Sequence, residues 1–95
     1  MEIKEQFYVI KNLTSGRFVF NSSRQSYSTP SYTKVLPDAQ CFETIEQAEQ
    51  AIDRIKSFYK KESDAGKIVN SNLLNGEFLI FQLTRTHAIT KEFHP

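Results

Sequence analysis

Apolar residues between positions 44 and 66 recur at alternating spacings of three and four, which is the repeat of one face of an α-helix. Thr44 is suited to the N-cap, with Gln47 three residues later to complete a capping box, and Gly66 is suited to the C-terminal stop. The pattern predicts one amphipathic helix over residues 44–66. A coiled coil or a partner-binding helix shows a similar stripe, but this one is short and single, so we expect it to pack against the protein's own sheet. The stripe consists of Ile45, Ala48, Ile52, Ile55 and Tyr59, widened by Ala51 and Phe58.

Two short segments near the N-terminus, residues 7–11 and 17–20, are rich in β-branched and aromatic residues and predict strands. Turn residues separate them, and Gly16 supplies any positive φ that the turn requires. We therefore expect a hairpin. Both sides of its first strand are apolar, which predicts a strand that is central in the sheet or covered over part of its length.

A third strand is predicted near residues 77–84, where apolar residues fall on both sides. Asn75-Gly76 is a strong signal for a type I′ turn, which would join this strand to a weaker one near residues 67–74. An irregular connection is the alternative for the weaker segment. A strand that is apolar on both sides is usually interior to a sheet, so we expect the strong strand there, with an extension to about residue 90 and a flexible tail over about 88–95. One side carries Phe78, Ile80 and Gln82, and the other carries Leu79, Phe81 and Leu83.

Residues 21–34 interrupt the pattern with a long serine-rich stretch that holds two tyrosines, two basic residues and no acid. Loops of this length in small domains are usually functional or disordered, although residues 25–27 or 31–35 could add an edge strand. Residues 35–40 then predict a turn or a single helical turn, and Phe42 is expected beneath the helix start. The fold class is α+β: one domain over residues 1–95, with an antiparallel sheet of three to five strands and one long amphipathic helix on one face.

The composition of the chain limits the modes of binding and the cellular location that we expect. The chain has 95 residues, a formal net charge of +1 and a single cysteine. The near-neutral charge argues against binding driven by a large basic field, and one cysteine cannot form an intramolecular disulfide. The N-terminus is polar and no apolar run approaches the length of a membrane helix, so we expect a cytoplasmic protein with no membrane partner.

Residues with catalytic or metal-binding chemistry are few and scattered. Cys41 stands before the helix, whereas His87 and His94 lie at the far end of the chain, with no recognised metal-ligand spacing. We expect Cys41 to be a small buried hydrophobe and both histidines to be solvated. The carboxylates lie mainly on the polar face of the helix, and no phosphate-binding glycine motif is present. These observations predict a protein that is not an enzyme and uses no metal or cofactor.

Ala39, Phe42, Thr44 and Ala48 form the pattern A-x-x-F-x-T-x-x-x-A, which opens the helix after the short strands. This order resembles a loose class of small proteins encoded by bacteriophages and other mobile elements, over roughly the first two-thirds of the chain. Some members of that class block host defence or host enzymes by occluding a surface. The resemblance implies a phage-encoded inhibitor that binds a host protein in the host cytoplasm, but it transfers no residue role because the class has no shared site motif.

The residues themselves point to the polar loop as a protein-binding surface. Tyrosine and arginine are favoured anchors of protein interfaces, and serine supplies adaptable hydrogen bonds. The alternative is a loop that is mobile and unused. The candidate binding residues are Arg24, Tyr27, Tyr32 and Lys34, with Tyr8 and Arg17 added from the neighbouring strands.

Two further readings remain open. In the first, the protein binds nucleic acid or a nucleotide, because aromatic residues on an open sheet face can stack on bases and basic residues can meet phosphates. The basic candidates for that role are Arg17, Arg24, Lys34 and Arg85, although the aromatic motif of RNA-recognition sheets is absent. In the second, a strong strand over residues 78–83, if it lies at a sheet edge, pairs with a second copy to form a homodimer.

Overall fold

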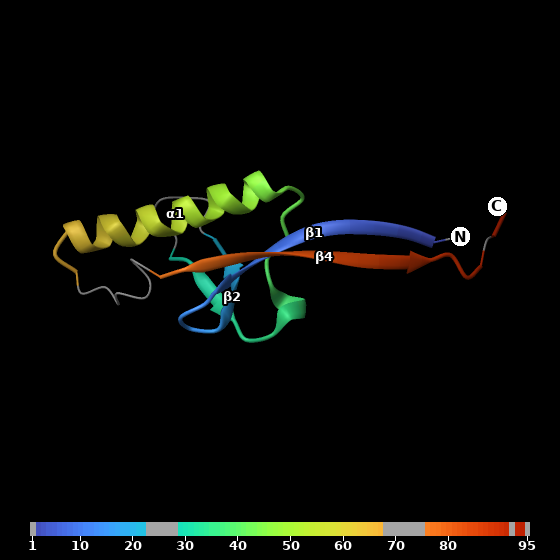
Figure 1. Ribbon diagram of the computed structural model, residues 1–95, viewed down its shortest axis with the longest axis horizontal. Coiled ribbons are helices and arrows are strands. Elements are labelled where there is room, and N and C mark those ends of the chain that lie inside the picture. The colour runs from blue at the N-terminus through green and yellow to red at the C-terminus, as the bar shows by residue number, and fades with distance from the viewer. Residues whose placement is uncertain (1, 23–28, 68–75, 92, 95) are drawn as a thin grey trace.

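The computed structural model describes residues 2–22, 29–67, 76–91 and 93–94. In this part of the chain, four antiparallel strands form one sheet in the order β3-β2-β1-β4, and one helix covers part of one face (Figure 1). The predicted α+β class is confirmed. The elements are β1 (Glu2–Asn12), β2 (Arg17–Asn21), β3 (Ser31–Thr33), the 3-10 turn η1 (Leu36–Asp38), α1 (Ile45–Asp64) and β4 (Phe78–Ala88).

The helix α1 begins and ends where its sequence predicts. The Thr44 hydroxyl accepts a hydrogen bond from the Gln47 N–H at 3.2 Å, and the Gln47 side-chain oxygen accepts one from the Glu43 N–H at 3.1 Å. The first bond satisfies an N–H that the first helical turn would otherwise leave unpaired, and the second ties Gln47 to the residue before the N-cap. At the other end Gly66 has a φ of 85°, the left-handed conformation that favours glycine after a helix.

The core lies between α1 and the sheet. Ile10 of β1 and Val19 of β2 are fully buried and meet the inward face of the helix. Burial of side chains of this size stabilises the fold by about 1.5–3 kcal/mol each. Phe42 packs into the same cluster beneath the helix start, as predicted. The helix contributes Ala48, Ala51, Ile55 and Tyr59 to this core.

The hairpin between β1 and β2 is confirmed, and Asn12 organises its turn. The Asn12 side-chain oxygen accepts hydrogen bonds from the backbone N–H groups of Thr14 and Ser15, at 2.9 and 3.1 Å. Its carbonyl oxygen accepts from the Gly16 N–H at 2.9 Å. Gly16 has a φ of 71°, so this position requires the conformational freedom of glycine.

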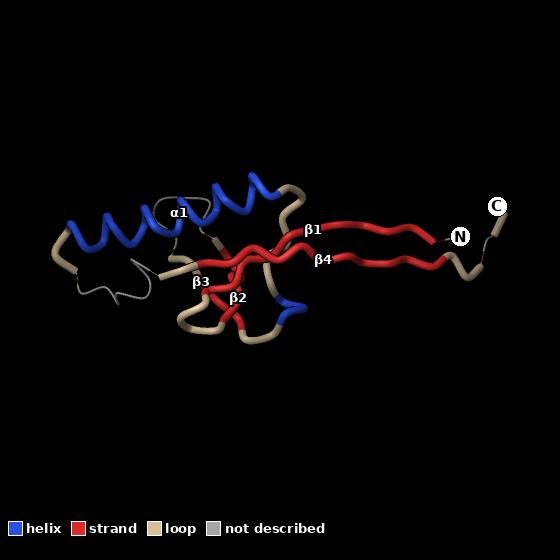
Figure 2. Tube along the Cα trace, in the orientation of Figure 1, coloured by secondary structure: helices blue, strands red, loops and turns tan. Residues whose placement is uncertain are grey.

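The strands β1 and β4 pair over their whole length, from Glu2 opposite Ala88 to Asn12 opposite Phe78. Both are longer than the segments 7–11 and 77–84 that the sequence predicts, and β4 ends close to the expected limit near residue 90. The extra length forms a two-stranded arm of residues 2–6 and 84–88, which projects away from the helix (Figures 1 and 2). The molecule is accordingly elongated, with extents of 62 × 26 × 21 Å.

Strand order corrects one prediction and confirms another. As expected, β1 is central, between β2 and β4. The strong strand β4 is at the edge of the described sheet and not in its interior. Both sides of β4 are apolar because one side packs toward α1 and the other lies on the opposite face of the sheet. Within the described residues its outer edge is backbone, which leaves no mark on the side-chain pattern. The predicted edge strand at 31–35 is present as β3. The alternative at 25–27, the weaker strand near 67–74 and its Asn75-Gly76 turn lie wholly or mostly outside the described residues.

Candidate functional site

An apolar hollow lies on the sheet face opposite α1, and we call it the open-face groove. Alternation along the strands turns Val9 and Phe81 to this face while their neighbours Ile10 and Ile80 face the helix. Leu36 of η1 borders the hollow from outside the sheet and is 41% exposed. The groove encloses about 200 Å³ and is lined by Val9, Lys11, Phe18, Leu36, Phe81 and Leu83.

Two cations lie over aromatic rings on this same face. The Lys11 ammonium is 5.6 Å from the centre of the Phe18 ring. The Arg85 guanidinium is 4.8 Å from the centre of the Phe7 ring, and Phe7 is the cross-strand neighbour of the groove residue Leu83. Contacts of this kind stabilise by about 0.5–1 kcal/mol at exposed sites, so they favour these positions of the two charges. The open-face groove is therefore an apolar hollow between two positive charges.

The outer edge of β4 presents backbone groups beside this groove. The Leu13 N–H donates to the Glu77 carbonyl at 2.9 Å, so the backbone polar groups of Glu77 point toward β1. Because these groups alternate along an antiparallel strand, the odd-numbered residues of β4 bond to β1 and the even-numbered residues point outward. In the described sheet no strand pairs with that outer side, which leaves an open edge from Phe78 to Ala88.

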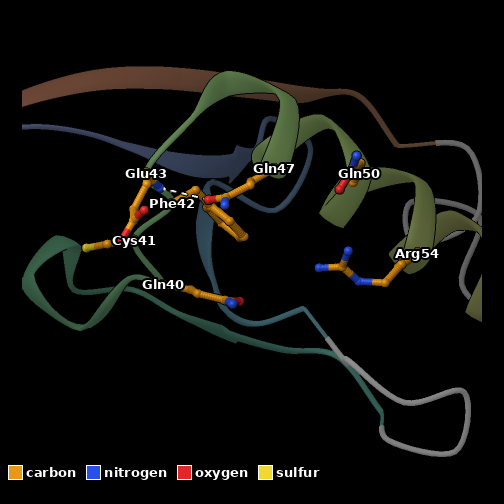
Figure 3. Close-up of a pocket in the computed structure, with 7 residues that line it drawn as sticks. All are labelled: Gln40, Cys41, Phe42, Glu43, Gln47, Gln50 and Arg54. Atoms are coloured by element: carbon orange, nitrogen blue, oxygen red, sulfur yellow. Dashed lines mark hydrogen bonds between the residues drawn. The ribbon is translucent and has the colours of Figure 1, made fainter.

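A second hollow of about 320 Å³ lies between the start of α1 and the segment before it. Gln40 and Arg54 extend toward each other across it (Figure 3). The two side chains are already engaged with buried Ser22: Gln40 accepts from the Ser22 N–H at 2.9 Å, and Arg54 donates to the Ser22 hydroxyl at 3.2 Å. Glu43 lines the same hollow and would repel an anion drawn to the guanidinium. This polar hollow is better explained as a structural network than as a ligand site.

The structure separates the binding residues that the sequence predicts. Tyr8 and Tyr32 are half-buried and pack against the core below α1, whereas Arg17 and Lys34 are exposed. The pairing of Phe18 with Thr33 brings Arg17 and Lys34 to the same end of β2 and β3, one residue further along the register. The remaining two candidates, Arg24 and Tyr27, lie outside the described residues.

Tyr32 has an unusual environment. The pKa of its phenol is raised from 10.0 to about 12, chiefly by burial and also by nearby Tyr59, while the Asn12 side chain offsets part of the rise. Within the described residues, neither the Tyr32 hydroxyl nor the Asn12 side-chain nitrogen has a hydrogen-bond partner of normal geometry. Tyr32 is thus a neutral phenol that stabilises the core through its ring.

None of the groove residues is among the binding residues predicted from the sequence, which favours the polar segment over residues 21–34. Only the nucleic-acid reading considered an aromatic sheet face, and it named Arg85 but not Lys11. The sequence does contain a sign of the groove. Two strands have apolar residues on both of their sides, and a single helix can cover only one side of a sheet, so the other apolar side has to face away from it. What the sequence could not supply was the strand order that brings Phe18 and Phe81 to the two sides of Val9.

Cys41 is exposed, so the prediction of a buried hydrophobe is wrong. Phe42 forms an isolated antiparallel bridge with Tyr8, and alternation about that bridge turns Phe42 inward and its neighbour outward. His87 and His94 are exposed, as expected. In the described ranges, no group of three or more histidine, cysteine or acidic side chains is placed to hold a metal ion. No helix there is both long and apolar enough to cross a membrane.

Comparison with known proteins yields no relative: no protein-family model, no curated protein and no solved structure matches the chain. The resemblance to phage-encoded proteins therefore stays a prediction.

Proposed function

We propose that this chain is a protein-binding module and that its open-face groove receives an apolar side chain of a partner protein. The observation that carries the proposal is the apolar hollow between Lys11 and Arg85, on the face of the sheet that α1 leaves uncovered. The polar segment over residues 21–34 remains a further candidate surface.

The size and lining of the groove suit a side-chain anchor. A hollow of about 200 Å³ is too small for a drug-sized ligand, since such pockets usually enclose about 300–1,000 Å³. It does accommodate one large apolar side chain, and buried anchors of that kind dominate the energetics of protein interfaces. The flanking cations favour a partner segment in which acidic residues stand beside the anchor, because complementary charges direct and orient association.

An inhibitory role in a host cell belongs to this proposal. A protein-binding module acts by contact, and contact through one face covers the surface of the protein that it binds. The setting, a phage-encoded protein in the host cytoplasm, rests on the sequence resemblance alone.

Nucleic-acid binding is the second candidate, favoured by the cation–ring pairs on the open face. Bases would stack on Phe7 and Phe18 only after Arg85 and Lys11 had moved off the rings. Glu5, directly across from Arg85, also weakens any attraction to phosphate. These features favour protein binding over nucleic-acid binding. If the protein bound nucleic acid, the affinity would fall steeply with salt.

Matched variants test the groove. Immobilised protein would capture partners from a nuclease-treated bacterial lysate, with Lys11→Glu compared with Lys60→Glu, which makes the same charge change on the exposed surface of α1. Leu36→Asp would be compared with Val35→Asp, since Val35 is 52% exposed and does not line the groove. We expect the two groove variants to reduce capture about tenfold or more, a loss typical of an interface anchor, and the two controls to retain it. Equal capture by all four variants would contradict the proposal.

A further inference from the structure

We propose that β4 pairs with β4 of a second copy of this chain, in antiparallel register about a two-fold axis through Phe81. The result is a homodimer with one continuous sheet, in which the two open-face grooves adjoin. This inference rests on the strand edge and its charges, and it stands whether or not the groove binds a partner protein.

The two edges of the described sheet differ in how well they are protected against pairing with another strand. The outer edge at β3 is short, at three residues, and the β2–β3 register shifts between Val19 and Asn21. Buried Pro30 directly precedes it. These are devices that blunt an edge against pairing. In contrast, β4 is 11 residues long and has no charged side chain before Arg85. An unprotected edge of this length is usually covered by another strand.

Backbone geometry restricts how two β4 strands can pair. Only the even-numbered residues present outward N–H and C=O groups, so hydrogen-bonded pairs must join even residues to even residues. In an antiparallel pair of identical strands, this condition requires the two-fold axis to pass through a residue and not between two residues. Each choice of that residue then fixes every cross-strand neighbour.

With Phe81 on the axis, Glu77 of each copy lies opposite Arg85 of the other copy. The same register places Leu79 opposite Leu83 and Phe81 opposite itself, so the open face pairs apolar with apolar and acid with base. An axis through Gln82 would put Leu79 opposite Arg85, and an axis through Leu83 would put Glu77 opposite Ile89. Glu77 is exposed and makes no ion pair within the described residues, which leaves it free for this contact.

The base of the projecting arm also gains a neighbour in this register. Residues 2–6 and 84–88 form only two strands, and an isolated two-stranded ribbon is marginally stable in water. In the proposed dimer, Thr84 and Arg85 of the arm lie opposite Phe78 and Glu77 of the other copy. Each arm then gains a third strand only at its base, from the start of the other copy's β4.

The first test measures association by sedimentation equilibrium. The wild type is expected to be a dimer, and Glu77→Arg or Arg85→Glu each to raise the dimer dissociation constant about tenfold or more, because symmetry places two like-charge pairs at the contact. Combining both substitutions restores opposite charges and is expected to restore association. A wild type that stays monomeric at the highest concentration, or a double variant that associates no better than the singles, would overturn the proposal.

The second test determines the register by cross-linking. On a Cys41→Ser background, Phe81→Cys places two thiols on the axis in a non-hydrogen-bonded pair, where Cα atoms are about 4.5 Å apart and within disulfide reach. Oxidation is expected to yield a covalent dimer. Leu83→Cys on the same background is the control, because residue 83 then faces residue 79 and should remain reduced. Efficient cross-linking of Leu83→Cys with none for Phe81→Cys would exclude this register.

Discussion

Tyr8 and Phe42 exchange two backbone hydrogen bonds, each 2.8 Å long. Tyr8 lies in the central strand β1, and Phe42 lies in the segment that leads into α1. The pair therefore joins the start of the helix to the middle of the sheet, and it turns the Phe42 ring beneath the helix. The position of α1, and with it the choice of which sheet face is left open, depends on this connection.

Replacing Phe42 with alanine tests the packing of the ring that this connection places beneath the helix. Phe42 is 6% exposed, so Phe42→Ala is expected to lower the free energy of unfolding by about 3–5 kcal/mol, through lost burial and the cavity that remains. Urea unfolding measures the change. Phe93→Ala is the matched control, because Phe93 is 77% exposed and its loss should change stability by less than about 0.5 kcal/mol. Similar effects of the two substitutions would mean that Phe42 is not part of the core.

The helix cap gives a smaller effect. Thr44→Ala removes the acceptor for the Gln47 N–H and is expected to cost about 1 kcal/mol in the free energy of unfolding. Thr44→Ser keeps the hydroxyl and should stay within about 0.5 kcal/mol of the wild type. Thermal unfolding followed by helix circular dichroism distinguishes the two variants. An alanine variant as stable as the serine variant would rule out a contribution from the cap.

The polar hollow beside α1 predicts a difference between two glutamines. Gln40→Ala leaves the N–H of buried Ser22 without its acceptor and is expected to cost about 1–3 kcal/mol. Gln50 lines the same hollow, but in the described part of the chain its side chain makes no hydrogen bond, so Gln50→Ala should have little effect. Equal losses in urea unfolding would contradict the structural reading of this hollow.

Tyr32 predicts an unusual dependence of stability on alkaline pH. Below pH 10 its phenol is neutral in both the folded and the unfolded chain, so its contribution to stability is constant. Because the folded pKa is raised from 10.0 to about 12, the unfolded chain loses the proton first, and stability falls as pH rises across that interval. In Tyr32→Phe the fall between pH 10 and 12 should be shallower, as measured by denaturation at fixed pH values.

At neutral pH, Tyr32→Phe should unfold no more easily than the wild type and gain up to about 1 kcal/mol, since the hydroxyl lost has no hydrogen-bond partner in the described residues. Tyr59, whose pKa burial also raises, is still present in the variant, so part of the alkaline fall in stability is expected to remain. A variant clearly less stable than the wild type at pH 7, or one with the same alkaline slope, would refute this view of Tyr32.

The helix and the hairpin could be predicted from the sequence because local signals define them. Thr44 and Gly66 mark the ends of α1, and Gly16 marks the turn between β1 and β2. Each of these signals acts within a few residues of the structure it specifies. The arm could not be predicted this way, since residues 2–6 face solvent and carry no alternation of apolar and polar positions.

The open-face groove and the free edge depend on strand order, which is a non-local property. Phe18 and Phe81 are far apart in sequence and come to one hollow only because β1 lies between β2 and β4. The sequence placed β4 in the sheet interior for the same reason: its side chains report which faces are covered, not whether its backbone has a neighbour. Cys41 shows the same limit of sequence-based prediction at a single residue. In an extended segment a shift of one position exchanges the buried and exposed sides, and the sequence does not define that shift.

We propose that this chain acts by binding another protein through its open face. The most direct measurement is affinity capture by the wild-type protein from a bacterial lysate, with and without nuclease and at low and high salt. We expect a stoichiometric protein whose capture survives nuclease and is lost when Lys11→Glu replaces the wild type. Captured material that disappears with nuclease would contradict this proposal and assign the open face to nucleic acid.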